Sequence, residues 1–253
     1  MTQHEKELQQ IKVASNHFMP KGAFIAGGAI TSVFTGKPIN DVDFYFKSKD
    51  DFIEAVGLAY EDGQWCVAAS DRAVTFASGD NIIQLMHFDF FPTAEAVFDA
   101  FDFTVCMAAY DLDKEEFVFH EDFMKHAAQR HLSFHSGTRY PYGSLLRVLK
   151  YQQRDYRIGR GDLLRIGLSL QKVKIESWDD LAAAIGGQYG DKAKIETDQP
   201  YSLEAAIDMF HNTEITVSTA SETMPSNAYD LLKKIGIDAE HMKEEDIEWL
   251  KGW

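Results

Sequence analysis

Residues 23–46 constrain the fold of this chain more than any other segment. A short apolar run meets Gly27 and Gly28, residues of helical character follow, and the run DVDFYF begins at Asp41. Alternation with period two places Asp41 and Asp43 on one face of a strand and the apolar side chains on the other. A rise of about 3.3 Å per residue separates the two aspartates by roughly 6.6 Å. Both carboxylates can therefore bind divalent ions that lie between them.

The two glycines stand where the predicted strand turns into a helix. Because glycine has no Cβ, backbone N–H groups there can approach a phosphate, and the helix dipole favours that anion. Ser32 and Lys37 follow within the same segment. A phosphate site beside metal-binding carboxylates is the minimum equipment for nucleotidyl transfer. We predict that Gly27, Gly28, Ser32 and Lys37 bind the phosphates of a nucleotide.

The segment at 23–46, together with two later segments, resembles the DNA polymerase beta nucleotidyltransferase superfamily, most closely the head domain of tRNA nucleotidyltransferases and bacterial poly(A) polymerases. FDFTVCMAAYD at 101–111 and, more weakly, residues 141–158 resemble two further segments of that family, in family order. Similar sequences also occur among nucleotidyltransferase-like proteins of phages and large DNA viruses. In the first segment the matching residues are Gly27, Gly28, Gly36, Pro38, Asp41 and Asp43.

The resemblance implies a nucleoside triphosphate substrate, ATP among the candidates, and two Mg²⁺ ions held by Asp41 and Asp43. It also implies a third carboxylate after a hairpin. The best-aligned position is Gln84, which cannot serve as an anionic ligand, and Asp89 is the nearest acid on the same predicted strand. Asp89 has the opposite parity unless a bulge intervenes. We predict Asp89 as the third catalytic residue and Asp102, another candidate, as a nucleotide-binding residue.

Two positions depart from the family pattern. An Arg-Asp pair after the glycines is replaced by Thr31-Ser32, and two arginines that help to hold the nucleotide in relatives are replaced by Ala100-Phe101. These departures motivate a second hypothesis, in which the protein binds nucleotide, RNA or a protein partner without catalysis.

A basic segment interrupts an acidic chain. Residues 125–174 contain eleven Lys and Arg and two acids, a surplus of nine positive charges in a chain of net charge −15, so the rest carries −24. Such a segment is a plausible phosphate-binding surface, although solvated helix faces would look the same. By family likeness, Arg147, Lys150 and Arg154 are predicted to bind nucleotide, and Arg139, Arg157 and Arg160 to bind RNA.

The elements predict an α+β fold, with a nucleotidyltransferase-like head at 1–135 and a helical neck and body region at 136–253. Strands are expected at 22–26, 41–47, 64–69, 72–77, 82–90, 103–110 and 115–119, and only helices from 121 onward. No apolar run approaches the roughly 18 residues of a membrane span. Cys66 and Cys106 lack metal-site spacing, which favours buried thiols and a cytoplasmic protein without a membrane partner.

The primary hypothesis is therefore a metal-dependent nucleotidyltransferase that acts on an acceptor hydroxyl, with an RNA 3′ end, such as that of a tRNA, as the acceptor implied by the resemblance. A third hypothesis shares this chemistry but is a toxin or antidefence protein that modifies a host tRNA or protein. The sequence does not separate these targets.

Overall fold

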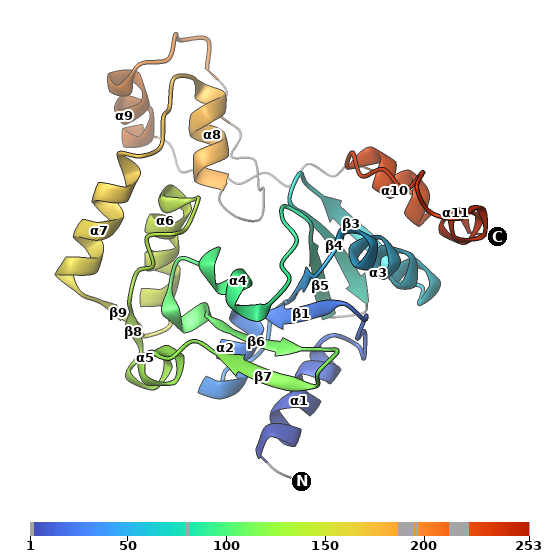
Figure 1. The fold of residues 1–253 in the computed structure, drawn as a ribbon. Helices are drawn as coiled ribbons and strands as arrows, with labels where there is room; N and C mark the ends of the chain where they lie inside the picture. Colours follow the sequence, from blue (N-terminus) through green and yellow to red (C-terminus); the bar gives the residue numbers. More distant parts are fainter. Residues whose placement is uncertain (1–2, 79–80, 187–194, 196, 213–222, 253) are drawn as a thin grey trace.

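A mixed sheet of seven strands forms the centre of the computed structural model, which describes residues 3–78, 81–186, 195, 197–212 and 223–252 (Figure 1). The sheet order is β3-β4-β5-β2-β1-β6-β7, and every neighbouring pair is antiparallel except β2 and β5. Its strands are β1 (Ala23–Ala26), β2 (Val42–Phe46), β3 (Trp65–Ala69), β4 (Ala73–Ser78), β5 (Asn81–Met86), β6 (Ala108–Asp111) and β7 (Glu116–Phe119).

Helices cover both faces of this sheet and continue beyond it. Figure 1 shows α6 to α9 extending from one side of the sheet, while α10 and α11 lie beside α3. The helices are α1 (Gln3–Ala14), α2 (Gly28–Thr35), α3 (Lys49–Glu61), α4 (Ala94–Asp99), α5 (Phe123–Gln129), α6 (Pro141–Gln152), α7 (Arg160–Leu170), α8 (Trp178–Gly186), α9 (Leu203–Asn212), α10 (Ala228–Lys234) and α11 (Glu244–Lys251). The predicted α+β class is confirmed.

The alternation of β2 determines which side chains enter the core. Val42, Phe44 and Phe46 are fully buried in the core between the sheet and α3. Tyr45, on the opposite face, is buried in a second core and packs edge-on against Phe101 with ring centroids 5.6 Å apart. This division agrees with the period-two prediction and leaves Asp43 on the face of Tyr45.

Three local expectations were wrong. The segment expected as one strand at 103–110 begins with a 3₁₀ turn, η1 (Thr104–Cys106), and β6 starts only at Ala108. The Thr104 hydroxyl hydrogen-bonds His126 Nδ1 at 2.7 Å and its N–H donates to Ser133 O at 3.1 Å, which draws these residues off the sheet. Strand β5 ends at Met86 rather than at residue 90, and the region after 121 contains a short parallel pair, β8 (His131–Leu132) and β9 (Arg157–Ile158).

Helix α6 is attached to the head through a buried ion pair. Arg147 Nη1 lies 2.9 Å from Asp102 Oδ1, and the Asp102 side chain is almost completely buried. The Cys106 thiol and the Tyr151 hydroxyl, 2.7 Å apart, lie beside the same guanidinium. Burial raises the pKa of the Tyr151 hydroxyl well above its usual value and also raises the pKa of the Cys106 thiol. Both groups therefore stay neutral beside the charged pair.

The last two helices return to the first core. Leu231 and Leu232 of α10 and Leu250 of α11 are buried with residues of α3 and the sheet, and the Tyr60 hydroxyl donates to Pro225 O at 2.7 Å. The predicted division at 135/136 did not anticipate that a C-terminal segment completes the N-terminal core.

A substitution at Gly57 of α3 tests the packing of α11 against the first core. A Cβ at Gly57 would lie 2.2 Å from the Trp249 ring of α11, so we expect Gly57→Ala to lower the free energy of unfolding by about 1–3 kcal/mol, measured by urea denaturation. Gly167→Ala on α7, where a Cβ meets nothing within 4 Å, is the matched control and should stabilise by up to about 1 kcal/mol. Equal effects of both substitutions would contradict this packing.

The Asp102 pair gives a second stability prediction. Asp102→Asn leaves the Arg147 charge uncompensated at a largely buried position, and we expect the free energy of unfolding to fall by about 2–4 kcal/mol. Arg139→Gln, which breaks the exposed Arg139–Asp89 pair, should cost less than about 1 kcal/mol. Urea denaturation of both variants makes the comparison, and a loss from Arg139→Gln as large as that from Asp102→Asn would exclude the proposed attachment.

Candidate functional site

The pairing of β1 with β2 brings the glycine turn beside the aspartates. Ala26, the last residue of β1, pairs with Asp43, and Gly27 then turns with φ of 83°. A Cβ at Gly27 would lie 3.8 Å from Asp43 Oδ2, so this positive-φ turn sits directly against the carboxylate. A Cβ at Gly28 would meet nothing within 4 Å. The first turn of α2 therefore faces open space beside Asp43.

A cavity of about 210 Å³ joins this turn to the strand carboxylates and the neck helix. One wall carries Asp41 and Asp43, and the opposite wall carries cationic side chains of α6 and of the residues that follow it. It is lined by Gly28, Ser32, Asn40, Asp41, Asp43, Gln84, Arg147, Lys150, Tyr151 and Arg154. Seven of these are among the residues that the sequence predicted: Gly28, Ser32, Asp41, Asp43, Arg147, Lys150 and Arg154.

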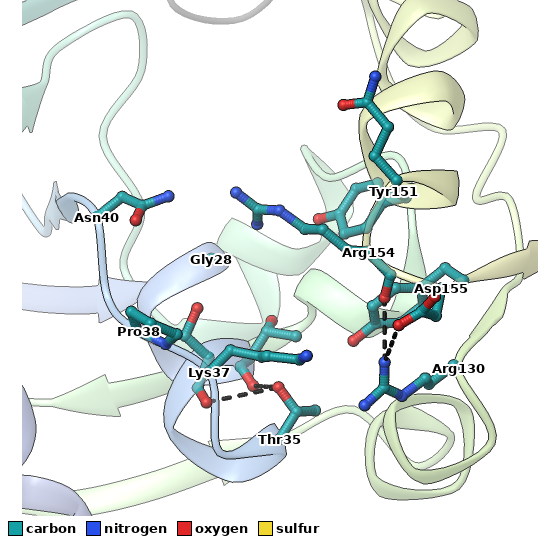
Figure 2. A pocket seen from close by; sticks show the side chains of 13 residues that line it. Gly28, Thr35, Lys37, Pro38, Asn40, Arg130, Tyr151, Arg154 and Asp155 are labelled. Carbon is teal, nitrogen blue, oxygen red and sulfur yellow. Dashed lines mark hydrogen bonds and ion pairs between the residues drawn. The ribbon is translucent and has the colours of Figure 1, made fainter.

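A second cavity of about 230 Å³ shares Gly28, Ser32, Asn40, Tyr151 and Arg154 with the first and extends along α2. Figure 2 shows the Arg154 side chain directed toward Asn40 across the space above Gly28, with Lys37 below it. The two cavities thus form one continuous site between head and neck.

The far end of the second cavity is shaped by a pair of turns. Arg130, with φ of 51°, and Asp155, with φ of 66°, adopt left-handed conformations, and Arg130 Nη1 lies 3.0 Å from Asp155 Oδ2. The same nitrogen donates to Arg154 O at 3.2 Å. This contact holds the loop after α6 in the position from which Arg154 reaches the cavity.

The third carboxylate position is occupied by a neutral side chain. Gln84 pairs with Asp43 across the parallel β2–β5 ladder, lines the cavity, and donates to Thr75 Oγ1 at 3.5 Å. Asp89 lies beyond the end of β5, is not among the lining residues of this cavity, and forms an ion pair with Arg139 at 2.8 Å. The structure therefore brings Gln84, not Asp89, beside Asp43.

The remaining predicted residues take different places. Asp102 contacts the site through its ion pair with Arg147. Arg157 in β9 and Arg160 at the start of α7 are exposed and line neither cavity, and Arg139 is held by Asp89. The predicted RNA-binding set thus lies outside the cavity.

At the positions that depart from the family pattern, Thr31 and Phe101 make packing and hydrogen-bond contacts within the head. The Thr31 hydroxyl donates to Val105 O at 2.6 Å, and Thr31 lines only the second cavity, whereas Ser32 lines both. The Phe101 ring lies beneath the glycine turn, with Cζ 3.6 Å from a Cβ built at Gly27. At this position an apolar ring that packs against the glycine turn therefore stands where relatives have an arginine.

Sequence reasoning did not select Asn40, Arg130 or Tyr151, all of which line the site. Asn40 could have been predicted as a site residue because it directly precedes Asp41, just before the start of β2. Arg130 belongs to the basic segment, but nothing in the sequence distinguished it from its neighbours. Tyr151 reaches the site only because α6 packs on the head.

Within the described residues, no helix combines the length and the apolar character that a membrane crossing needs.

The fold resembles that of CCA-adding enzymes. An apo form matches with a TM-score of 0.52 and 16% identity over 71% of this chain and 46% of that chain. The Thermotoga maritima enzyme complexed with tRNA matches with 0.51 and 15%, over 81% and 50%, and a complex with ATP with 0.51 and 16%, over 67% and 44%. At these identities the likeness concerns the fold alone, which is that of nucleotidyltransferase heads.

Two sequence comparisons identify a narrower family. Residues 3–130 match the profile described as Gabija anti-defense 2 family protein. The protein "Gabija anti-defense 2" of Bacillus phage SPbetaL7 is 41% identical over 190 residues, which are 74% of this chain and 48% of that protein. The chain thus spans about half the length of this curated relative. With the profile matching half of its length, the chain belongs to the Gabija anti-defense 2 family.

Proposed function

We propose that this protein is an anti-defence factor that transfers a nucleoside monophosphate from a nucleoside triphosphate to an acceptor hydroxyl. The observation that carries the proposal is the division of charge in the head–neck cavity, with Asp41 and Asp43 on one wall and Arg147, Lys150 and Arg154 on the other. A triphosphate alone would be repelled by the carboxylates. With a bound divalent cation, the triphosphate is attracted to both sets of side chains: the carboxylates contact the metal, and the basic side chains contact the phosphates.

The donor set fits a metal that arrives with the nucleotide. Among the described residues there is no group of three or more His, Cys, Asp or Glu that could hold a metal by itself. Mg²⁺ commonly binds through one or two carboxylates, with substrate phosphates and water completing its shell, and Asp41 and Asp43 supply those carboxylates. A bound Mg²⁺ would neutralise phosphate charge and lower the pKa of the acceptor hydroxyl. The second predicted ion would have the same two carboxylates and the neutral Gln84 amide beside it.

The chain's own residues position the substrate. The N-terminus of α2 presents backbone N–H groups to a phosphate at Gly28, where there is no side chain to obstruct it. Lys150 and Arg154 neutralise the triphosphate from the opposite wall, and Lys37 extends the positive lining into the second cavity. Arg147 is held in place by Asp102, so it can contribute charge at a fixed position without a large loss of side-chain entropy.

A second candidate function is nucleotide binding without transfer, and Gln84 favours it. Removing one anion from a three-carboxylate site weakens metal binding while leaving the cations for phosphate intact. In that case the protein would act by occupying its target rather than by modifying it. The predicted RNA acceptor, such as a tRNA 3′ end, belongs to the transfer hypothesis and stays a prediction.

Transfer is tested by substituting the aspartates. We expect Asp41→Asn or Asp43→Asn to lower Mg²⁺-dependent incorporation of label from α-³²P nucleoside triphosphates by about 100-fold or more, because each removes one of two metal carboxylates. The assay adds total cell extract and separates RNA, protein and small molecules. Asp179→Asn, an exposed position on α8, is the control. Unchanged incorporation in both aspartate variants, with unchanged thermal melting, would refute the mechanism.

Restoring the third anion separates the two candidate functions. Gln84→Glu places a carboxylate one strand from Asp43, about 4.8 Å away between backbones, and we expect the Mg²⁺ concentration for half-maximal incorporation to fall several-fold. Gln84→Leu, similar in size and unable to bind a metal, is the matched control. If the protein only binds nucleotide, the wild-type protein with Gln84 would incorporate no label. Calorimetry would then detect nucleotide binding that does not require metal.

A further inference from the structure

Among the described residues, the face of β3, β4 and β5 that carries Gln84 is partly exposed: Thr75, Ala77, Ile82 and Gln84 are half-buried, and Trp65 on the edge strand is exposed. On the opposite face of these strands, Val74, Phe76, Ile83 and Leu85 are buried in the core. This face begins beside the buried Asp43, which pairs with Gln84, and continues through Thr75 to Ala68. A neighbouring row consists of Ile82, Ala77 and Trp65, each paired with the next. We call this surface the neutral strip: Trp65, Ala68, Thr75, Ala77, Ile82 and Gln84.

The strip starts at the proposed reaction centre. Three strand spacings of about 4.8 Å separate β2 from β3, so the strip extends roughly 14 Å from Asp43. The two cavities are lined on their other sides by α2 and α6 and account for the nucleotide. An acceptor that reaches Asp41 and Asp43 from the β5 side therefore has to lie along this strip.

Trp65 is the outstanding side chain of the strip. Its side chain is 78% exposed on the outermost strand, and Val67 beside it is 50% exposed. Tryptophan is strongly enriched among residues that dominate binding energy at protein interfaces. A β-bulge between Cys66 and Ala68 interrupts the ladder at this edge. The bulge disfavours addition of a further strand, so recognition here falls to side chains.

The charge of the strip selects the class of acceptor. None of the residues of β3, β4 and β5 is charged. Surfaces that bind single-stranded RNA combine stacking aromatics with cations that follow the phosphates. Here the three strands carry no cation, and Arg72, directly before β4, stacks on the Tyr140 ring at 4.1 Å. A neutral surface of Trp, Ala, Thr and Ile suits the backbone and apolar side chains of a polypeptide instead.

We infer that the acceptor is a polypeptide that lies across the neutral strip, with an apolar side chain against Trp65 and a Ser, Thr or Tyr hydroxyl at Asp41 and Asp43. This inference rests on the proposed transfer activity and specifies its substrate. An extended chain covers 14 Å in about four residues, which sets the separation of the apolar anchor and the hydroxyl. The hydroxyl oxygen forms a bond to the α-phosphorus, the bond from that phosphorus to the bridging oxygen breaks, pyrophosphate leaves with the electron pair, and the hydroxyl proton passes to solvent.

The test compares label transfer to protein and to RNA. Full-length wild type and Trp65→Ala are incubated with Mg²⁺ and α-³²P nucleoside triphosphates, once with nuclease-treated host-cell protein and once with total RNA from the same cells. We expect label in the protein fraction and a loss of about 10-fold with Trp65→Ala, while the nucleotide Kd from calorimetry stays unchanged. Trp65→Phe should recover most of the signal. Leu164→Ala, a 69% exposed apolar residue on α7, should behave as wild type.

Each other outcome is decisive. Label that enters RNA and not protein overturns the inference and leaves nucleotidyl transfer intact, as does protein labelling that Trp65→Ala leaves unchanged. Absence of label from both fractions with the wild-type protein refutes the transfer activity itself, and the inference with it.

Discussion

The antiparallel register of β1 with β2 is the constraint on which the site depends. Because Ala26 pairs with Asp43 and β1 ends there, the chain must turn at Gly27 beside the carboxylate, and the first turn of α2 follows within one strand spacing. The Gly27 N–H donates to Ala108 O at 3.2 Å, which fixes the turn from the β6 side. A slip of one residue would move Asp43 to the core face and Phe44 to the cavity. The apolar packing of β2 therefore also positions the polar site.

Electrostatic balance explains how this site exists in an acidic protein. Asp43 is only 4% exposed, and burying a carboxylate near a second one is unfavourable unless positive charge lies close by. The basic neck supplies that charge, and Arg147 is held there by Asp102 and Tyr151. With Gln84 in place of a third acid, the site has fewer anions to balance.

Much of this arrangement was predictable from local sequence, and the failures have physical causes. The strand of Asp43 and the helix after Gly28 follow from alternation and from glycine, both local signals. The 3₁₀ turn at Thr104 was missed because an apolar run does not show where a long-range hydrogen bond to His126 will bend it. The packing of α10 and α11 on the first core was also missed, because the apolar pattern of a short amphipathic helix does not show which surface it packs against. Strand alternation already argued against Asp89, because a residue five positions after Gln84 faces the other side of a regular strand.

A shared fold does not determine the acceptor. The likeness to CCA-adding enzymes is a likeness of scaffold at 15–16% identity, and a scaffold can host many targets. The elements that position the glycine turn and the carboxylates serve any nucleotidyl acceptor equally well. In the proposed activity, discrimination has to come from the surface that leads to them, and in this chain that surface carries an exposed Trp65 on uncharged strands. Because the cations that would bind a triphosphate lie on the neck, the proposal assigns nucleotide binding and acceptor recognition to different parts of the fold.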